Sequence, residues 1–402
     1  MAPGRGRKES GLTRDVESRP RSTRRQLLAS TAALGAGLTS PLWARRVLAR
    51  DDGRGTGSAE RLDEARREAI RRGCIFLAGE DGASGKLRKD GGFGKSDQGV
   101  VALTALTVLA LMSDGSTDGR GPYGRAVRRG LDFLLKLVEE RRPELSWHPG
   151  YFFHPADKSS RMHGQGYATL ALATALGTST GKRYRRIRKV LAKAVACIEA
   201  SQTQTGGFGY DPVPTGEHEG SVTVAVAQGL RAARDAGLVV DPNVVQRGLR
   251  YLKRSQKGDG SFKYSLYVDR PSYALTAAAL SSFFLYGRYM DLPGERVIES
   301  GLDYMMKQAP VVLQTHRWYY YGHFYAAWTC WQKDGDRWDP RSGGNWARWH
   351  RLVYPDLLSK QKAGDGAWSD SDDQFQFGDV LPTAFAILTL AIPDEVLPIF
   401  QR

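Results

Sequence analysis

Residues 358–391 read LSKQKAGDGAWSDSDDQFQFGDVLPTAFAILTLA, and this stretch decides the fold. A helical run ends near Gln361, a glycine-rich turn carries Gly366 and Trp368, and an apolar run with Thr383 near its start follows. The same succession of features recurs upstream along the chain. Because self-similarity at a regular spacing is the signature of repeat architectures, the sequence is that of a repeat protein.

An aromatic residue that follows each turn marks the repeats. The six markers are Phe93, Trp147, Phe208, Phe262, Trp318 and Trp368. Successive markers are 50 to 61 residues apart, which is long enough for two helices and a turn. The sequence therefore predicts six copies of one helix hairpin.

Each unit contains two helical segments of different character. In the first, as in residues 125–138, 187–200 and 244–252, charged and apolar residues alternate at helical spacing, which is typical of a helix with one face in water. The second is apolar almost all round, as in VVALTALTVLALM at residues 100–112, which is typical of a buried helix. We therefore predict an all-α fold, an α/α toroid of about six helix-hairpin repeats with an outer and an inner ring.

The turn with Gln361, Gly366 and Trp368, and its copy at residues 256–262, resembles the QW repeat of squalene–hopene cyclases and protein prenyltransferase β subunits. The resemblance covers residues 59–399 and implies one toroid domain of the terpenoid cyclase/protein prenyltransferase type. In that family the glutamine ties the end of one helix to the start of the next, and the aromatic residue packs in the turn. The chain also resembles exported bacterial members of this repeat family, many of which have no assigned reaction.

The N-terminal segment has the features of an export signal. Arg24 and Arg25 precede a mildly apolar run, as in Tat-type signal peptides. We expect a signal peptide at residues 1–49, a linker at residues 50–58 and an exported protein, periplasmic or at the cell envelope. The alternative is a basic tail with an incidental arginine pair. Because the apolar run is shorter than a membrane span, no integral membrane segment is expected after signal cleavage.

Charge and cysteine content exclude several classes of function. The net charge is +15, but residues 1–50 hold eleven Lys/Arg and three Asp/Glu, so a nucleic-acid partner is not expected. Cys74, Cys197 and Cys330 form no C-x-x-C pair and are expected to be buried as small apolar residues. The Asp-x-Cys zinc pattern of protein prenyltransferases does not occur. We expect no metal and no other cofactor.

The starts of the inner helices are the candidate site, because in toroids that the chain resembles they face the mouth of a central cavity. The polar residues there are Asp97, His163, Glu217, His218, Glu219, His323 and Asp379. The aromatic residues there are Tyr151, Phe152, Phe153, Tyr167, Tyr273, Tyr319, Tyr320, Tyr321, Phe324, Tyr325 and Trp328. A hollow of this composition suits an isoprenoid or other lipid. The predicted ligand-binding residues are His163, Tyr167, Tyr320, His323 and Asp379; alternatively, the aromatic residues fill the core and the histidines cap helices.

A possible catalytic motif occurs after the last marker. Residues 370–373 spell D-x-D-D, the acid motif of class II terpene cyclases, whose middle aspartate would be Asp372. In that family the motif opens an inner helix and is followed by Thr-Ala, whereas here Thr383 comes ten residues after Asp373. The alternative is a solvated loop. The candidate catalytic residues are Asp372, Asp379 and His323.

Three functions remain open at this point. The first is an exported toroid that binds an apolar, isoprenoid-like ligand, with its reaction unassigned. The second is a class II terpene cyclase or mutase that uses a mouth carboxylate as its acid. The third is a non-catalytic interaction scaffold at the cell envelope. A deep apolar hollow favours the first two, and a buried carboxylate within it favours the second over the first.

Overall fold

The computed structural model describes residues 55–79, 88–94, 98–140, 148–286, 294–315, 317–335, 343–370 and 377–401. These residues contain twelve α-helices and no β-strand. The predicted signal peptide, most of the predicted linker, Asp97, Trp147 and Asp372 lie outside them. Helix α2 begins at Gly55, so the helical part starts within the segment that was expected to be a linker.

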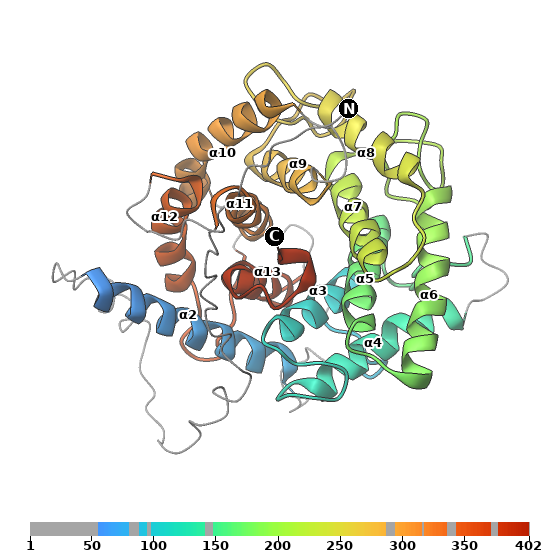
Figure 1. Cartoon of the computed structure of the whole chain (residues 1–402). Coiled ribbons are helices and arrows are strands. Elements are labelled where there is room, and N and C mark those ends of the chain that lie inside the picture. Colours follow the sequence, from blue (N-terminus) through green and yellow to red (C-terminus); the bar gives the residue numbers. More distant parts are fainter. Residues whose placement is uncertain are drawn as a thin grey trace, which may run out of the picture. The chain divides into compact units, whose positions relative to one another are not determined.

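The helices form two concentric rings (Figure 1). The outer helices are α2 (Gly55–Ala78), α4 (Gly124–Glu139), α6 (Gly181–Ala200), α8 (Pro242–Arg254), α10 (Glu295–Thr315) and α12 (Asn345–Ser359). The inner helices are α3 (Val100–Ser113), α5 (Arg161–Leu176), α7 (Gly220–Asp235), α9 (Tyr273–Tyr286), α11 (Tyr319–Asp334) and α13 (Val380–Ala391). Each inner helix contacts the next, and α13 contacts α3, so the inner ring closes on itself.

Hydrophobic patterning explains which helix is inside. Every residue of α3 is buried, as the uniformly apolar run predicts. In α4, by contrast, Val127, Leu131 and Leu134 are buried while Arg125 and Arg128 remain exposed, so one face packs on the inner ring and the other meets water. The predicted pairing of an amphipathic outer helix with a buried inner helix is confirmed.

Glutamine side chains connect the outer helices through the turns. The Nε2 atom of Gln202 donates to the carbonyl of Gly206 in its own turn and to that of Val244 in α8, each at 2.8 Å. Gln256 bonds in the same way to Gly260 and to Val297 in α10. Each glutamine thus satisfies one carbonyl in its turn and one in the next outer helix, in line with the role that the resemblance implies.

The marker aromatics have a second shared contact. The backbone N–H of Phe93, Phe208, Phe262 and Trp368 donates to the hydroxyl of a threonine in the following inner helix, at 2.9–3.1 Å. All four aromatic side chains are buried. Trp318 also lies in the turn before an inner helix, as the repeat predicts, but it differs from these four in exposure and backbone conformation. It is the N-cap residue of α11, with φ 52° and 42% of its surface exposed.

The three cysteines are buried and unpaired, which confirms that they behave as small apolar residues. No helix among the described residues combines the length and the hydropathy that a membrane crossing requires.

Candidate functional site

A cavity of about 660 Å³ lies where the six inner helices begin, and we refer to it as the mouth cavity. Its wall includes residues at or next to the first turn of every inner helix. They include Gly99, Ala102, Ser160, Arg161, His163, Glu219, Ser221, Ser272, Ala274, Leu275, Trp318, Tyr320, Tyr321, Gly378, Leu381 and Pro382. Deeper apolar residues such as Leu103, Leu106 and Phe385 complete it. The closed ring therefore brings together residues that are far apart in the sequence.

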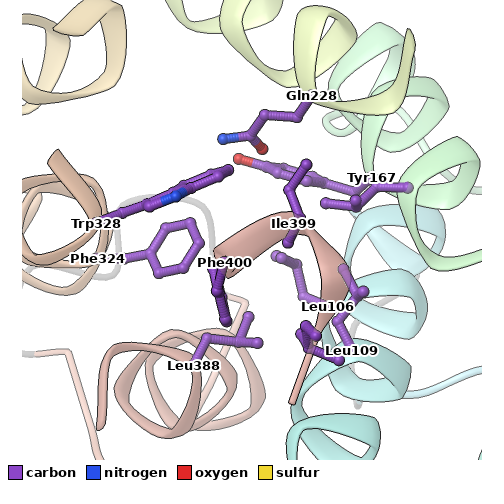
Figure 2. A pocket seen from close by; sticks show the side chains of 11 residues that line it. Leu106, Leu109, Tyr167, Gln228, Phe324, Trp328, Leu388, Ile399 and Phe400 are labelled. Atoms are coloured by element: carbon purple, nitrogen blue, oxygen red, sulfur yellow. The ribbon is translucent and has the colours of Figure 1, made fainter. Parts of the chain in front are cut away.

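The opposite end of the ring is closed. The C-terminal segment with η2 (Pro398–Phe400) packs there, and Phe400 contacts the rings of Phe324 and Trp328. A small void of about 10 Å³ lies there, and Figure 2 shows Gln228, Trp328, Ile399 and Phe400 among the side chains that line it. Leu106 and Tyr167 line both this void and the mouth cavity. In the part of the chain that the structure describes, the mouth cavity therefore has a floor of packed side chains at this end of the ring.

Glu219 places a buried carboxyl group in the cavity wall. It is the N-cap residue of α7, where its Oε2 accepts a hydrogen bond from the backbone N–H of Val222 at 2.8 Å. The residue is 3% exposed, and no Lys or Arg forms an ion pair with it among the described residues. Burial raises the pKa of Glu219 to about 7, although hydrogen bonds from Ser221 and Val222 act in the opposite direction.

Ser221 joins Glu219 to a histidine of the neighbouring inner helix. Its hydroxyl donates to both carboxylate oxygens of Glu219, with 2.9 Å to Oε2, and lies 2.8 Å from Nε2 of His163 on α5. Burial lowers the pKa of His163 to about 4, so the imidazole is neutral near neutral pH. The hydroxyl of Ser221 therefore connects the protonatable carboxyl group of Glu219 with the neutral imidazole of His163.

Tyr167 and Tyr321 line the adjoining part of the wall, and the phenol of Tyr325 packs behind them. The hydroxyls of Tyr167 and Tyr325 lie 3.1 Å apart, and Tyr325 donates to Oε1 of Gln228 at 3.2 Å. Tyr321 packs edge-on against Tyr325, with ring centroids 4.7 Å apart. Burial raises the pKa of Tyr167, Tyr321 and Tyr325 well above the ordinary value, so these side chains remain hydroxyl donors.

The rim of the cavity contains strained backbone. Three non-glycine residues among those described have positive φ, and two of them, Arg161 (φ 42°) and Trp318 (φ 52°), line the cavity. Such conformations are unfavourable for side chains with a Cβ and are concentrated at functional sites. Arg161 also pairs with Asp211 at 3.3 Å, and Lys158 and Arg270 are further basic residues of the rim.

Three of the five predicted ligand-binding residues line the mouth cavity, namely His163, Tyr167 and Tyr320. His323 lies elsewhere. It is 1% exposed, its Nδ1 is 2.9 Å from the hydroxyl of Tyr273, and its ring packs against Tyr319 and Trp349. His163 is the third residue of α5 and His323 the fifth of α11, and each position turns a side chain by about 100° around a helix. The two histidines therefore face different neighbours.

Asp379 also lies outside the cavity wall. Its carboxylate pairs with Lys362 at 2.7 Å and accepts a hydrogen bond from Ser369 at 2.7 Å, which holds the turn before α13. Asp370, the first residue of the D-x-D-D run, lines the cavity, whereas Asp372 is outside the described residues.

The repeat register contained a signal for Glu219 that the site prediction did not use. Glu219 precedes Thr223 by four residues, as Asp379 precedes Thr383, so the two acids occupy equivalent positions. Ser221 had no comparable signal, because a serine at the start of a helix is common. Only the fold shows that it lies between two titratable side chains.

Comparisons with known proteins agree with this architecture. No family model and no curated protein matches the chain. The cellobiose 2-epimerase of Spirochaeta thermophila is 14% identical, with a TM-score of 0.58, over 86% of this chain and 98% of its own. The GH76A α-1,6-mannanase of Salegentibacter sp. HEL1_6 is 9% identical, with a TM-score of 0.55, over 83% and 99%.

The chain is an α/α toroid. A type II terpene cyclase from Scytonema is also similar, at 17% identity and a TM-score of 0.49 over 84% of this chain and 99% of its own. At identities this low, the first two likenesses show the toroid fold alone. The chemistry of the mouth cavity must therefore be argued from its own residues.

Proposed function

We propose that this toroid binds a ligand with an apolar, isoprenoid-like body in the mouth cavity. The observation that carries the proposal is the cavity itself. Its volume of about 660 Å³ falls within the range of roughly 300–1,000 Å³ found for small-molecule sites. Leu103, Leu275 and Phe385 supply apolar wall, and the tyrosines add rings with polar tips. A ring filled throughout would instead have favoured an interaction scaffold.

The rim favours a ligand with an anionic end. Lys158, Arg161 and Arg270 lie there, while the first N–H groups of two inner helices already have carboxylate partners. Asp157 accepts from Gly99 and Val101 at the start of α3, at 3.1 and 2.9 Å, and Glu219 accepts from Val222 in α7. An anionic headgroup would therefore contact the basic side chains, and not these helix N-termini.

Catalysis with a mouth carboxylate is the second candidate, and Glu219 is the observation that favours it. The sequence pointed to Asp372, but Glu219 is the buried carboxyl group in the wall of the hollow. A carboxyl group with a pKa of about 7 is about half protonated at pH 7, and its protonated form can act as a general acid there.

Lipid retention by the purified protein tests the binding proposal. The protein is incubated with a bacterial lipid extract and separated by gel filtration, and retained molecules are identified by mass spectrometry. Leu275→Trp, which adds bulk to the cavity wall, should remove most of the retained lipid. Leu137→Trp is the matched control, because Leu137 is also partly buried but lies on outer helix α4. Equal retention by wild type and Leu275→Trp would contradict the proposal.

We also propose that the protein is exported to the periplasm or cell envelope. Arg24 and Arg25 before the mildly apolar run support this proposal. It is independent of the ligand, and its test is given in the Discussion.

A further inference from the structure

We propose that Glu219, Ser221 and His163 form a proton-transfer chain that enolises a carbonyl-containing ligand bound in the mouth cavity. The inference rests on the proposed ligand-binding function and adds a reaction class to it. Its basis is geometric, because Ser221 lies 2.9 Å from Oε2 of Glu219 and 2.8 Å from Nε2 of His163. All three residues line the same cavity.

The order of the three groups excludes a hydrolase triad. In a Ser–His–acid triad the acid orients the imidazole, and the imidazole activates the serine. Here the acid bonds to the serine, and no described hydrogen bond joins Glu219 to His163. Ser221 therefore lies between a donor and an acceptor, where a hydroxyl can accept one proton and give up another.

The surroundings are suited to a mild acid and a neutral base. Burial raises the pKa of Glu219 to about 7 and lowers that of His163 to about 4, so at pH 7 about half of the Glu219 carboxyl groups are protonated and the His163 imidazole is neutral. Among the described residues, phenols surround Glu219: Tyr210 and Tyr264, whose hydroxyls lie 2.9 Å apart, and Tyr167, Tyr251 and Tyr321. An acid of this strength suits proton transfer beside a carbonyl better than protonation of an isolated alkene, which demands a stronger acid.

Every proton that one group loses in this step is gained by another group. A proton leaves the carbon next to the ligand carbonyl for Nδ1 of His163, and its bonding pair becomes the C=C of the enol. The carbonyl π pair takes the proton of Glu219 and becomes O–H. The Nε2 proton of His163 then moves to Ser221, and the Ser221 proton moves to Glu219. The reverse sequence, at the same or another carbon, restores the ketone and the first imidazole tautomer without an oxidant or a reductant.

Deuterium uptake by an isoprenoid ketone tests the proposed proton-transfer chain. Geranylacetone is incubated with the protein in D₂O near pH 7, and deuterium next to its carbonyl is measured by mass spectrometry. Binding is measured separately by quenching of tryptophan fluorescence. Wild type should accelerate exchange over buffer, and Glu219→Gln should lower the rate by about 100-fold or more while binding persists. Glu217→Gln, an exposed neighbour of the same type, should exchange like wild type.

The bridging and base groups are tested by rescue. Ser221→Ala should slow exchange, and Ser221→Thr, which keeps a hydroxyl, should restore most of it. His163→Ala should be slow and should recover when imidazole is added to the solution, which a purely structural loss would not do. Binding with no exchange above buffer would overturn the proton-transfer chain alone. Failure of geranylacetone to bind would overturn this inference, while the lipid-retention experiment tests the isoprenoid-like ligand separately. Covalent labelling of Ser221 by a fluorophosphonate would also overturn it, in favour of a nucleophilic serine.

Discussion

The side-chain amide of Gln361 donates a hydrogen bond to the backbone carbonyl of Ala69 at 2.8 Å, and this bond joins the last repeat to the first outer helix. The same Nε2 atom bonds to the carbonyl of Gly366 in its own turn at 2.9 Å. Elsewhere such glutamines connect consecutive repeats, as Gln202 does with Val244. At Gln361 the same contact joins the last repeat to the first and so closes the outer ring.

Ring closure through Gln361 should therefore contribute measurably to stability. Gln361→Ala leaves the buried Ala69 and Gly366 carbonyls without this donor, and we expect a loss of about 1–3 kcal/mol in the free energy of unfolding. Urea denaturation followed by circular dichroism measures it. Gln246→Ala is the control, because among the described residues Gln246 accepts a single exposed hydrogen bond, from Arg250, and the substitution should change stability by less than about 0.5 kcal/mol. Equal effects of the two substitutions would show that the ring does not depend on this contact.

Trp368 and Trp318 provide a matched pair for the role of the marker aromatics. Trp368 is fully buried, and its indole N–H donates to the carbonyl of Leu357 at 2.8 Å, whereas Trp318 is 42% exposed. Trp368→Ala should therefore cost about 3–5 kcal/mol, and Trp318→Ala less than about 1 kcal/mol. The same denaturation experiment measures both. A loss below about 1 kcal/mol for Trp368→Ala would mean that the aromatic position is dispensable in the repeat.

The fold was predictable because it depends on which helix faces are buried, and the pattern of apolar and charged residues indicates those faces. Residues 100–112 are apolar all round and could be stable only inside, whereas residues 125–138 carry a charged face that must meet water. Six such pairs with short turns leave a closed double ring as a simple way to bury every inner helix. Trp318 departed from the pattern, and it lies at the rim of the cavity, where local rules of folding are often broken.

The site was less predictable because it depends on the direction in which each side chain points and on the residues that it contacts in the folded protein. Glu219 and Asp379 hold equivalent repeat positions, yet Lys362 and Ser369 bind the Asp379 carboxylate, whereas Glu219 is buried and forms no ion pair with the described Lys and Arg residues. Nothing in the local sequence around residue 219 distinguishes these outcomes. Likewise, His163 and His323 both lie near the start of an inner helix, but their positions in the helix differ by two residues. Because of this rotation, His163 lines the cavity and His323 is packed in the core.

Export is tested with the N-terminal arginines. Replacing both Arg24 and Arg25 with lysine should abolish export of the folded protein, because Tat-type signals are read through the twin arginines. Immunoblots of cytoplasmic and periplasmic fractions measure the result. Lysine keeps the charge, so replacement of Arg5 and Arg7 by lysine serves as the control and should leave export intact. Unchanged export of the Arg24 and Arg25 variant would show that the pair is incidental.

The pH dependence of stability should reveal the state of Glu219. Its pKa is about 7 in the folded protein and its ordinary value is 4.5, so the folded state binds more protons than the unfolded state between these values. The contribution of Glu219 to the free energy of unfolding is therefore highest below pH 4.5, falls as pH rises and levels off above about pH 7. The pKa difference corresponds to about 3 kcal/mol. His163 has the opposite effect, since its pKa is lowered from 6.5 to about 4, and stability from it rises across that range.

Glu219→Gln separates the two contributions, because glutamine does not titrate and His163 remains. The free energy of unfolding of wild type minus that of the variant should decrease steadily from pH 4.5 to pH 7.5, by about 3 kcal/mol, as measured by urea denaturation at each pH. Glu217→Gln, at the exposed neighbouring position, should give a flat difference. A difference for Glu219→Gln that rises with pH would mean that Glu219 is ionised in the folded protein. It would then be unable to act as the acid of the mouth cavity, whatever the cavity binds.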